Sequence, residues 1–241
     1  MGLLNQRATA VMKLLITFLS ILLFWIEAQK ENSDFLVING LGAKVFEAPT
    51  FESGIIDTLS LGQKIQVEKS IPTAEKYFVG PDWGIEGKWI KAQGIEGYIF
   101  SSDLTDKEVE FTLDDFEETK FDLKGKLLDQ KEEEKKIKNE EGEFPVHLTY
   151  EYYENGTYSR KSFDGCFDHL WEFKNLSLSE VYHQMLNDYS EYSSNLEFSS
   201  PVFTEKSGNI IRFQVKDGPT EDLKIEIKEN GTFEVSSYDC T

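Results

Sequence analysis

The sequence predicts a β unit followed by an α+β unit: a small β-barrel, then an antiparallel-sheet domain with one main helix. Residues 35–104 hold frequent glycines and short alternating apolar and polar runs with no sustained helical period, a pattern typical of small strands. Residues 144–241 contain one segment with helical spacing among several strand-like segments separated by turn residues. The chain is 39% hydrophobic and 13% aromatic, which is enough to build a core.

Residues 1–28 are typical of a secretory signal peptide. Arg7 and Lys13 supply positive charge, residues 14–26 are almost entirely apolar, and Ala28 offers a small residue for cleavage. A helix over the apolar run spans about 20 Å, short of a bilayer core of roughly 30 Å. We therefore expect cleavage near Ala28 and export to the periplasm or the extracellular space. The alternative is an N-terminal membrane anchor over residues 14–26, because the residue two positions before Ala28 is not small.

Residues 35–104 predict the barrel. Runs such as 65–67 and 89–91 alternate between apolar and polar side chains, as half-buried strands do. Gly62 and Gly97 suit tight turns or bulges between such strands. The side chains expected to fill the interior are Val45, Ile56, Leu59, Ile65, Val67, Trp89, Ile90 and Ile99.

The segments of this region follow one another in a recognisable order. Residues 43–49 (AKVFEAP) lead to a proline, and residues 54–67 (GIIDTLSLGQKIQV) look like a strand, a glycine turn and a second strand. Residues 87–100 (GKWIKAQGIEGYIF) hold a tryptophan strand and a glycine-aromatic strand, and residues 101–104 (SSDL) match a terminal turn. In this order and spacing they resemble the bacterial SH3 domain family (SH3b), small barrels found in exported envelope proteins.

The resemblance implies an SH3-like barrel over residues 35–104 and a ligand such as cell-wall peptidoglycan or a peptide. The chain departs from the family pattern in two places. Phe46 stands where the family has an arginine, and residues 71–86 form a longer insertion that carries aromatic side chains.

Exposed aromatic side chains between the early loop and this insertion are the candidate ligand site, because aromatic anchors usually dominate recognition. The alternative is that Trp83 and Tyr98 simply cap the barrel core. The candidate ligand-binding residues are Phe46, Phe51, Tyr77, Trp83 and Tyr98.

Residues 105–143 predict an acidic charged linker. The run over 128–143 (LDQKEEEKKIKNEEGE) has too few apolar side chains to pack. A solvated linker, the tip of a long hairpin and an exposed helix are all compatible with this composition.

Residues 144–241 predict an α+β domain of no recognised family. Asn155-Gly156 follows an alternating run and indicates a β-hairpin. Ser177 and Glu180 have the spacing of a capping box at the start of a helix. Leu176 and Val181 stand at the positions of a hydrophobic staple. The expected helix then carries apolar and aromatic side chains at helical spacing: Leu178, Val181, Tyr182, Met185 and Tyr189. Four strands are expected after the helix, over 196–203, 209–216, 222–228 and 232–238.

Cys166 and Cys240 are the two cysteines of the chain. In an exported protein an even number of cysteines favours a disulfide. A bridge between them closes a loop of about 75 residues, worth on the order of 4 kcal/mol in the chain-entropy picture. Two free buried thiols are the alternative.

The charge excludes some classes of partner. The chain has 44 acidic against 25 basic residues, a formal net charge of −19. Nucleic-acid binding and adhesion to an anionic membrane both need basic patches, so we expect neither partner.

Catalytic motifs are sparse. The histidines are His147, His169 and His183, and none stands at the spacing of an HExxH zinc site. No glycine-rich phosphate motif and no spaced acidic calcium loop occurs, so we expect no metal and no cofactor.

The sequence thus favours a monomeric, exported, non-enzymatic protein that serves as a binding or scaffolding module in the cell envelope. Its expected partners are peptidoglycan or an envelope protein or peptide. The alternative is a cell-wall hydrolase or peptidase with Cys166 as nucleophile and His169 as its base.

Overall fold

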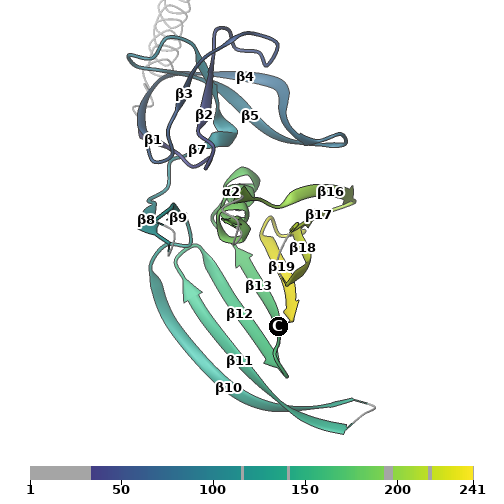
Figure 1. The fold of residues 1–241 in the computed structure, drawn as a ribbon. Coiled ribbons are helices and arrows are strands. Elements are labelled where there is room, and N and C mark those ends of the chain that lie inside the picture. Colours follow the sequence, from purple (N-terminus) through teal and green to yellow (C-terminus); the bar gives the residue numbers. More distant parts are fainter. Residues whose placement is uncertain (1–33, 115–116, 140–141, 193–197, 217–218, 241) are drawn as a thin grey trace, which may run out of the picture.

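Strands dominate the chain, and they gather into two large sheets (Figure 1). The computed structural model describes residues 34–114, 117–139, 142–192, 198–216 and 219–240. The signal segment expected over residues 1–28, with the alternative anchor over 14–26, lies outside the described residues. No helix in these ranges is long and apolar enough to cross a membrane.

The first sheet has seven strands in the order β3-β2-β6-β5-β4-β1-β7. It curls around one hydrophobic cluster to which every one of its strands contributes a buried side chain. Its elements are β1 (Asp34–Val37), β2 (Ala43–Phe46), β3 (Ile55–Leu59), β4 (Lys64–Gly80), β5 (Trp83–Ala92), β6 (Tyr98–Phe100) and β7 (Leu104–Thr105), with the 3-10 helix η1 (Ser101–Asp103) before β7.

Most of the expected interior side chains are buried in this sheet. Ile56 is not, because its side chain is 51% exposed. Leu59 lies three residues further along β3 and is buried, and successive side chains of a strand point to opposite faces. The expectation that both residues face inward was therefore wrong for Ile56. The buried members are Val45, Leu59, Ile65, Val67, Trp89, Ile90 and Ile99.

The second sheet has eight strands in the order β10-β11-β12-β13-β19-β18-β17-β16. It curls into a half-barrel whose concave side holds helix α2 (Figure 1). Its strands are β10 (Leu127–Asn139), β11 (Gly142–Tyr153), β12 (Gly156–Phe163), β13 (Cys166–Phe173), β16 (Val202–Ser207), β17 (Ile210–Gln214), β18 (Thr220–Ile227) and β19 (Phe233–Cys240). Two small two-stranded sheets are formed by β8 (Glu110–Leu113) with β9 (Thr119–Asp122) and by β14 (Glu191–Tyr192) with β15 (Phe198–Ser199).

Helix α2 (Leu178–Tyr189) begins where the sequence predicts. The Ser177 hydroxyl accepts from the Glu180 backbone N–H at 3.3 Å, and the Glu180 carboxylate accepts from the Ser177 backbone N–H at 2.7 Å. This reciprocal capping box satisfies two backbone donors that the first turn leaves without partners. Val181 and Met185 are buried on the face that packs against the sheet.

The charged segment over 105–143 is largely strand, not an unpaired linker. Strand β10 pairs with β11 along its whole length, from Leu127 opposite Tyr153 to Asn139 opposite Gly142. Of the three arrangements compatible with the composition, the long hairpin is the one observed. Because β10 is an edge strand, solvent can take its charged side chains, and charge at an edge opposes pairing with other chains.

The hairpin expected at Asn155-Gly156 joins β11 to β12, but Gly156 is the first residue of β12. A Cβ on Gly156 would lie 2.2 Å from the Glu172 carbonyl oxygen of β13, so this position needs glycine for close approach. The last four expected strands correspond to β16, β17, β18 and β19 with shifted ends.

The two large sheets share a hydrophobic cluster. Ile38, which directly follows β1, and Trp83 and Ile85 of β5 pack with side chains of α2 and of the half-barrel. The Thr105 hydroxyl donates to the buried Glu180 carboxylate at 2.5 Å, which links β7 to the first turn of α2. This junction positions the walls of a cavity.

Candidate ligand cavity between the two sheets

Four of the five aromatic side chains predicted to bind a ligand meet in one cluster. Phe46 is buried, and its ring centroid lies 5.6 Å from that of Phe51 and 5.3 Å from that of Trp89. Tyr77 reaches Phe51 at 6.3 Å, and Tyr98 packs against the same group. These rings therefore pack mostly against one another in edge-on or tilted contacts.

Trp83 lies apart from this cluster. It is only 4% exposed, and its ring centroid is 5.6 Å from that of Tyr182 and 5.9 Å from that of Phe213. Trp83 is therefore part of the core shared by the two sheets. It lies neither in a ligand groove nor in the interior of the seven-stranded sheet.

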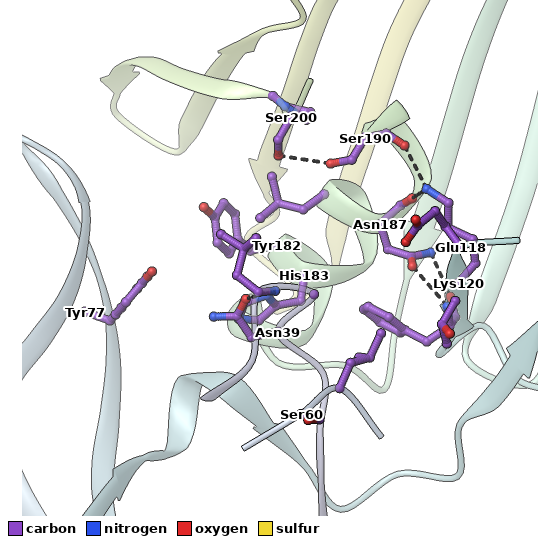
Figure 2. Close-up of a pocket in the computed structure, with 17 residues that line it drawn as sticks. Asn39, Ser60, Tyr77, Glu118, Lys120, Tyr182, His183, Asn187, Ser190 and Ser200 are labelled. Atoms are coloured by element: carbon purple, nitrogen blue, oxygen red, sulfur yellow. Dashed lines mark hydrogen bonds between the residues drawn. The ribbon is translucent and has the colours of Figure 1, made fainter. Parts of the chain in front are cut away.

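A cavity of about 780 Å³ opens beside this shared core (Figure 2). Loops of the seven-stranded sheet and Tyr77 of β4 provide one wall, and β9 and residues 182–187 of α2 provide the other. Tyr77 is the one predicted aromatic that reaches it. The polar lining comes from Asn39, Ser60, Tyr77, Glu118, Thr119, Lys120, Tyr182, His183, Asn187, Ser190 and Ser200, and the apolar lining from Leu41, Leu61, Phe121, Leu186 and Pro201.

His183 is the most unusual side chain of the lining. It is 3% exposed, and its Nε2 has no hydrogen-bond partner within the described part of the chain. This atom lies 3.4 Å from Asp103 Oδ1, and that oxygen accepts instead from Asn39 Nδ2 at 3.0 Å. Buried polar atoms in proteins are nearly always hydrogen-bonded, so this atom of a lining residue is an exception.

The lining also contains two tyrosines, Tyr77 and Tyr182, and the ring centroid of Tyr182 lies 5.3 Å from that of His183. In Figure 2 Tyr77 extends from β4 toward Tyr182 and His183 on α2. Neither hydroxyl forms a hydrogen bond with any described residue. Burial and the negative charge of Asp103 raise the pKa of Tyr77, and burial raises the pKa of Tyr182. Both phenols therefore stay protonated at neutral pH and can both donate and accept.

Lys120, Asn187 and Ser190 of the wall are hydrogen-bonded and hold it in place. Lys120 Nζ donates to the carbonyl oxygens of Ser190 at 2.8 Å and Asn187 at 3.2 Å, at the C-terminal end of α2. The Asn187 side chain bonds the backbone N–H and carbonyl of Phe121 at 3.0 and 2.8 Å, and the Ser190 hydroxyl bonds that of Ser200 at 3.0 Å. Strand β9 is thus fixed to the helix.

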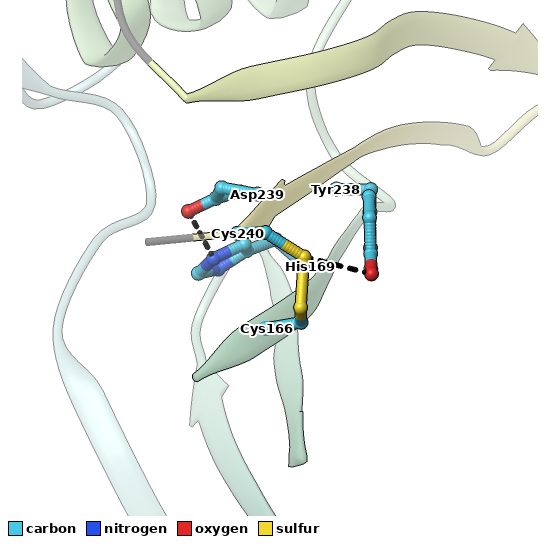
Figure 3. Close-up of a disulfide and its surroundings, with 5 residues drawn as sticks. All are labelled: Cys166, His169, Tyr238, Asp239 and Cys240. Carbon is cyan, nitrogen blue, oxygen red and sulfur yellow. Dashed lines mark hydrogen bonds and ion pairs between the residues drawn. A yellow bond between two sulfur atoms is a disulfide. The ribbon is translucent and has the colours of Figure 1, made fainter. Parts of the chain in front are cut away.

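The disulfide lies on the half-barrel, outside the lining of this cavity (Figure 3). Cys166 of β13 and Cys240 of β19 stand directly opposite each other and are bonded, which confirms the predicted bridge. A sulfur held in a disulfide cannot act as the thiolate nucleophile of the alternative hydrolase. Nearby, His169 Nε2 lies 3.2 Å from Asp239 Oδ2, and His169 Nδ1 lies 2.6 Å from the Tyr158 hydroxyl. Both ring nitrogens of His169 are therefore engaged.

No sequence pattern predicts the cavity. His183 reads as one helix residue among others, and Tyr182 belongs to the helical apolar stripe. Their neighbours Asn39, Tyr77 and Asp103 lie some 80 or more positions earlier, so no local pattern links them. This face of the helix becomes a cavity wall because the seven-stranded sheet, which is distant in sequence, lies across from it.

No three His, Cys, Asp or Glu side chains of the described ranges converge as they would around a metal ion. Comparison with known proteins gives no relative: the chain matches no protein-family model, no curated protein and no solved structure at a significant level.

Proposed function

We propose that this protein is an exported, non-enzymatic binding module of the cell envelope and that the cavity between the seven-stranded sheet and α2 is its ligand site. The observation that carries the proposal is the buried His183 Nε2 in the wall of a cavity of about 780 Å³. This atom makes no hydrogen bond with the described residues, although Asp103 Oδ1 lies 3.4 Å away. That volume lies within the range of roughly 300–1,000 Å³ that small-molecule sites occupy.

The lining supports binding more than chemistry. The raised pKa of Tyr77 and of Tyr182 keeps both phenols protonated, so they serve as hydrogen-bonding groups and are poor bases. The hydroxyls of Ser190 and Ser200 bond each other, and no base stands within hydrogen-bonding distance of either among the described residues. A rigid wall with a few free polar groups suits selective binding.

The sequence supports the location and the class of protein. The proposed signal segment, the disulfide and the resemblance of residues 35–104 to SH3b domains all fit an exported envelope protein. In this proposal the seven-stranded sheet is the SH3-like barrel. Its loops contribute Asn39, Leu41, Ser60 and Leu61 to the cavity, so the barrel takes part in the site.

Gly40 offers a clean way to test the site. It lines the cavity, and a Cβ added there meets no heavy atom within 4 Å. Gly40→Trp should therefore fill the mouth of the cavity without disturbing the fold. Gly54→Trp is the matched control, because Gly54 directly precedes β3, is exposed, is absent from the cavity lining and has room for a side chain.

The experiment is affinity selection with mass-spectrometric detection. The purified wild type, the Gly40→Trp variant and the Gly54→Trp variant are incubated with soluble peptidoglycan fragments, envelope peptides and small molecules extracted from envelopes. We expect the wild type and Gly54→Trp to retain the same compound and Gly40→Trp to lose at least ten-fold of it. Retention of nothing, or equal retention by Gly40→Trp, contradicts the proposal.

A further inference from the structure

We propose that the cavity binds a small organic cation, a protonated amine carried on an apolar or aromatic skeleton. This inference rests on the proposed function, because it names the class of ligand for the same cavity. It is drawn from the charges, the free hydrogen-bonding atoms and the apolar surface of the wall.

Two carboxylates near the cavity have no lysine or arginine as an ion-pair partner among the described residues. On the side of the seven-stranded sheet, the Asp103 carboxylate lies directly behind Asn39 and His183 and is itself 5% exposed. On the opposite side, Glu118 lines the cavity with an exposed carboxylate that has no ion-pair partner among the described residues. A buried carboxylate favours a nearby positive charge because the surrounding dielectric is low.

The one lysine of the lining does not offset this charge for a ligand. Lys120 Nζ is held by the carbonyl oxygens of Asn187 and Ser190 and lies 3.9 Å from Asp114 Oδ2. Its ammonium therefore compensates the negative end of the α2 dipole. An anionic ligand would have to compete with those carbonyl oxygens for it.

The free polar atoms of the wall suit an ammonium group. The hydroxyl oxygens of Tyr77 and Tyr182 are unoccupied acceptors, and phenol rings also attract cations through their faces. Burial is the main cause of the raised pKa of both tyrosines, and the negative charge of Asp103 adds to it at each. His183 completes this group, because its Nε2 makes no hydrogen bond within the described part of the chain.

The rest of the cavity suits a carbon skeleton. Leu41, Leu61, Phe121, Leu186 and Pro201 line it, and Leu41 is 82% exposed although it is apolar. Covering such surface with an apolar ligand favours binding, because it removes apolar area from water. The combination of a negative polar end and apolar walls favours an amine with a hydrophobic body over a sugar or a phosphate.

Three probes with the same skeleton isolate the effect of charge: tryptamine, 3-ethylindole and indole-3-propanoate. Isothermal titration calorimetry with the full chain at low ionic strength gives the dissociation constant of each. We expect tryptamine to bind at least ten-fold more tightly than 3-ethylindole and indole-3-propanoate to bind most weakly. The advantage of tryptamine should shrink as salt is added, because salt screens charges.

Two variants locate the charge that is responsible. Asp103→Asn keeps an acceptor for Asn39 and should weaken tryptamine binding about ten-fold while leaving 3-ethylindole binding unchanged, which also reports that the cavity is intact. Glu118 is exposed, so Glu118→Gln should leave folding unchanged and should weaken tryptamine binding more modestly. Glu229→Gln, an exposed turn residue outside the cavity, is the matched control and should change nothing.

The outcomes separate the two proposals. If 3-ethylindole or indole-3-propanoate binds as tightly as tryptamine and Gly40→Trp abolishes that binding, the amine inference falls and the cavity remains a ligand site. If none of the three binds at millimolar concentration while the affinity selection retains another compound, the amine inference also falls alone. If the affinity selection retains nothing as well, both proposals fail.

Discussion

Glu75 shows how one side chain stabilises the aromatic cluster of the seven-stranded sheet. Its carboxylate accepts from the Thr50 hydroxyl at 2.7 Å and from the Trp89 indole N–H at 2.8 Å. These hydrogen bonds, that of Thr50 first, lower the pKa of Glu75 below its ordinary value of 4.5. Trp89 is fully buried, so its N–H depends on this acceptor.

A pH dependence follows from that lowered pKa. The contribution of Glu75 to stability is fully present above pH about 4.5, the ordinary value, and is lost as the pH falls through the lower folded-state pKa. Urea unfolding followed by tryptophan fluorescence between pH 6 and pH 3 measures it. We expect Glu75→Gln to lose less stability than the wild type over this interval. Parallel curves for the two proteins would contradict this assignment.

His183 and Ile56 mark the limit of inference from single residues. A polar helix residue can face solvent or lie under another element, and the helix alone does not decide which. Ile56 could have been placed correctly, because a strand that buries Leu59 must direct residue 56 to its other face. The position of His183 can be known only from the tertiary structure, while that of Ile56 follows from the two-residue period of a strand.

Helix α2 joins local and long-range contacts at Glu180. The same buried carboxylate completes the capping box and accepts from the Thr105 hydroxyl of β7. The cap was predictable, because Ser177 and Glu180 are three residues apart. The bond to Thr105, 75 positions away, was not.

Substitutions should separate the two contributions. Ser177→Ala removes the cap and should cost about 1 kcal/mol of unfolding free energy. Glu180→Ala should cost about 2–3 kcal/mol, because it also leaves the buried Thr105 hydroxyl without its acceptor. Urea denaturation monitored by circular dichroism gives both values, and the exposed Glu229→Ala should stay within about 0.5 kcal/mol of the wild type. Equal losses for Ser177→Ala and Glu180→Ala would show that the link to β7 contributes nothing.

Strand β10 illustrates how a sheet overrides composition. Lys131 and Lys135 both pair with Glu133 along the strand, at 2.7 Å in the case of Lys135. Exposed pairs of this kind contribute little to stability. The segment is a strand because its backbone pairs with that of β11, the strand that contains Val146 and Tyr150. Its side-chain chemistry alone did not select the strand conformation.

At the scale of the whole molecule, the disulfide ties the last strand into the middle of the half-barrel. Cys240 ends β19, which lies between β13 and β18, and the bridged residues are 74 positions apart. Such a bridge stabilises the fold mainly by restricting the unfolded chain. It is also compatible with a protein exported to an oxidising compartment.

Reduction should therefore lower the free energy of unfolding by about 4 kcal/mol. Guanidinium unfolding with and without dithiothreitol measures the loss, and titration of thiols should detect two sulfurs only after reduction. The double variant Cys166→Ser, Cys240→Ser should match the reduced wild type and ignore the reductant. Identical unfolding of the oxidised and reduced wild type would refute the stabilising role.

The sequence by itself determined the elements whose signals are local. The capping box of α2, the strand-rich composition and the even cysteine count all follow from spacing or from chain chemistry. Only the tertiary structure decided that the charged run becomes β10, that Trp83 packs in a shared core and that His183 faces a cavity. Each of these depends on contacts between residues far apart in sequence, and no local pattern records which distant surface will cover a given strand or helix.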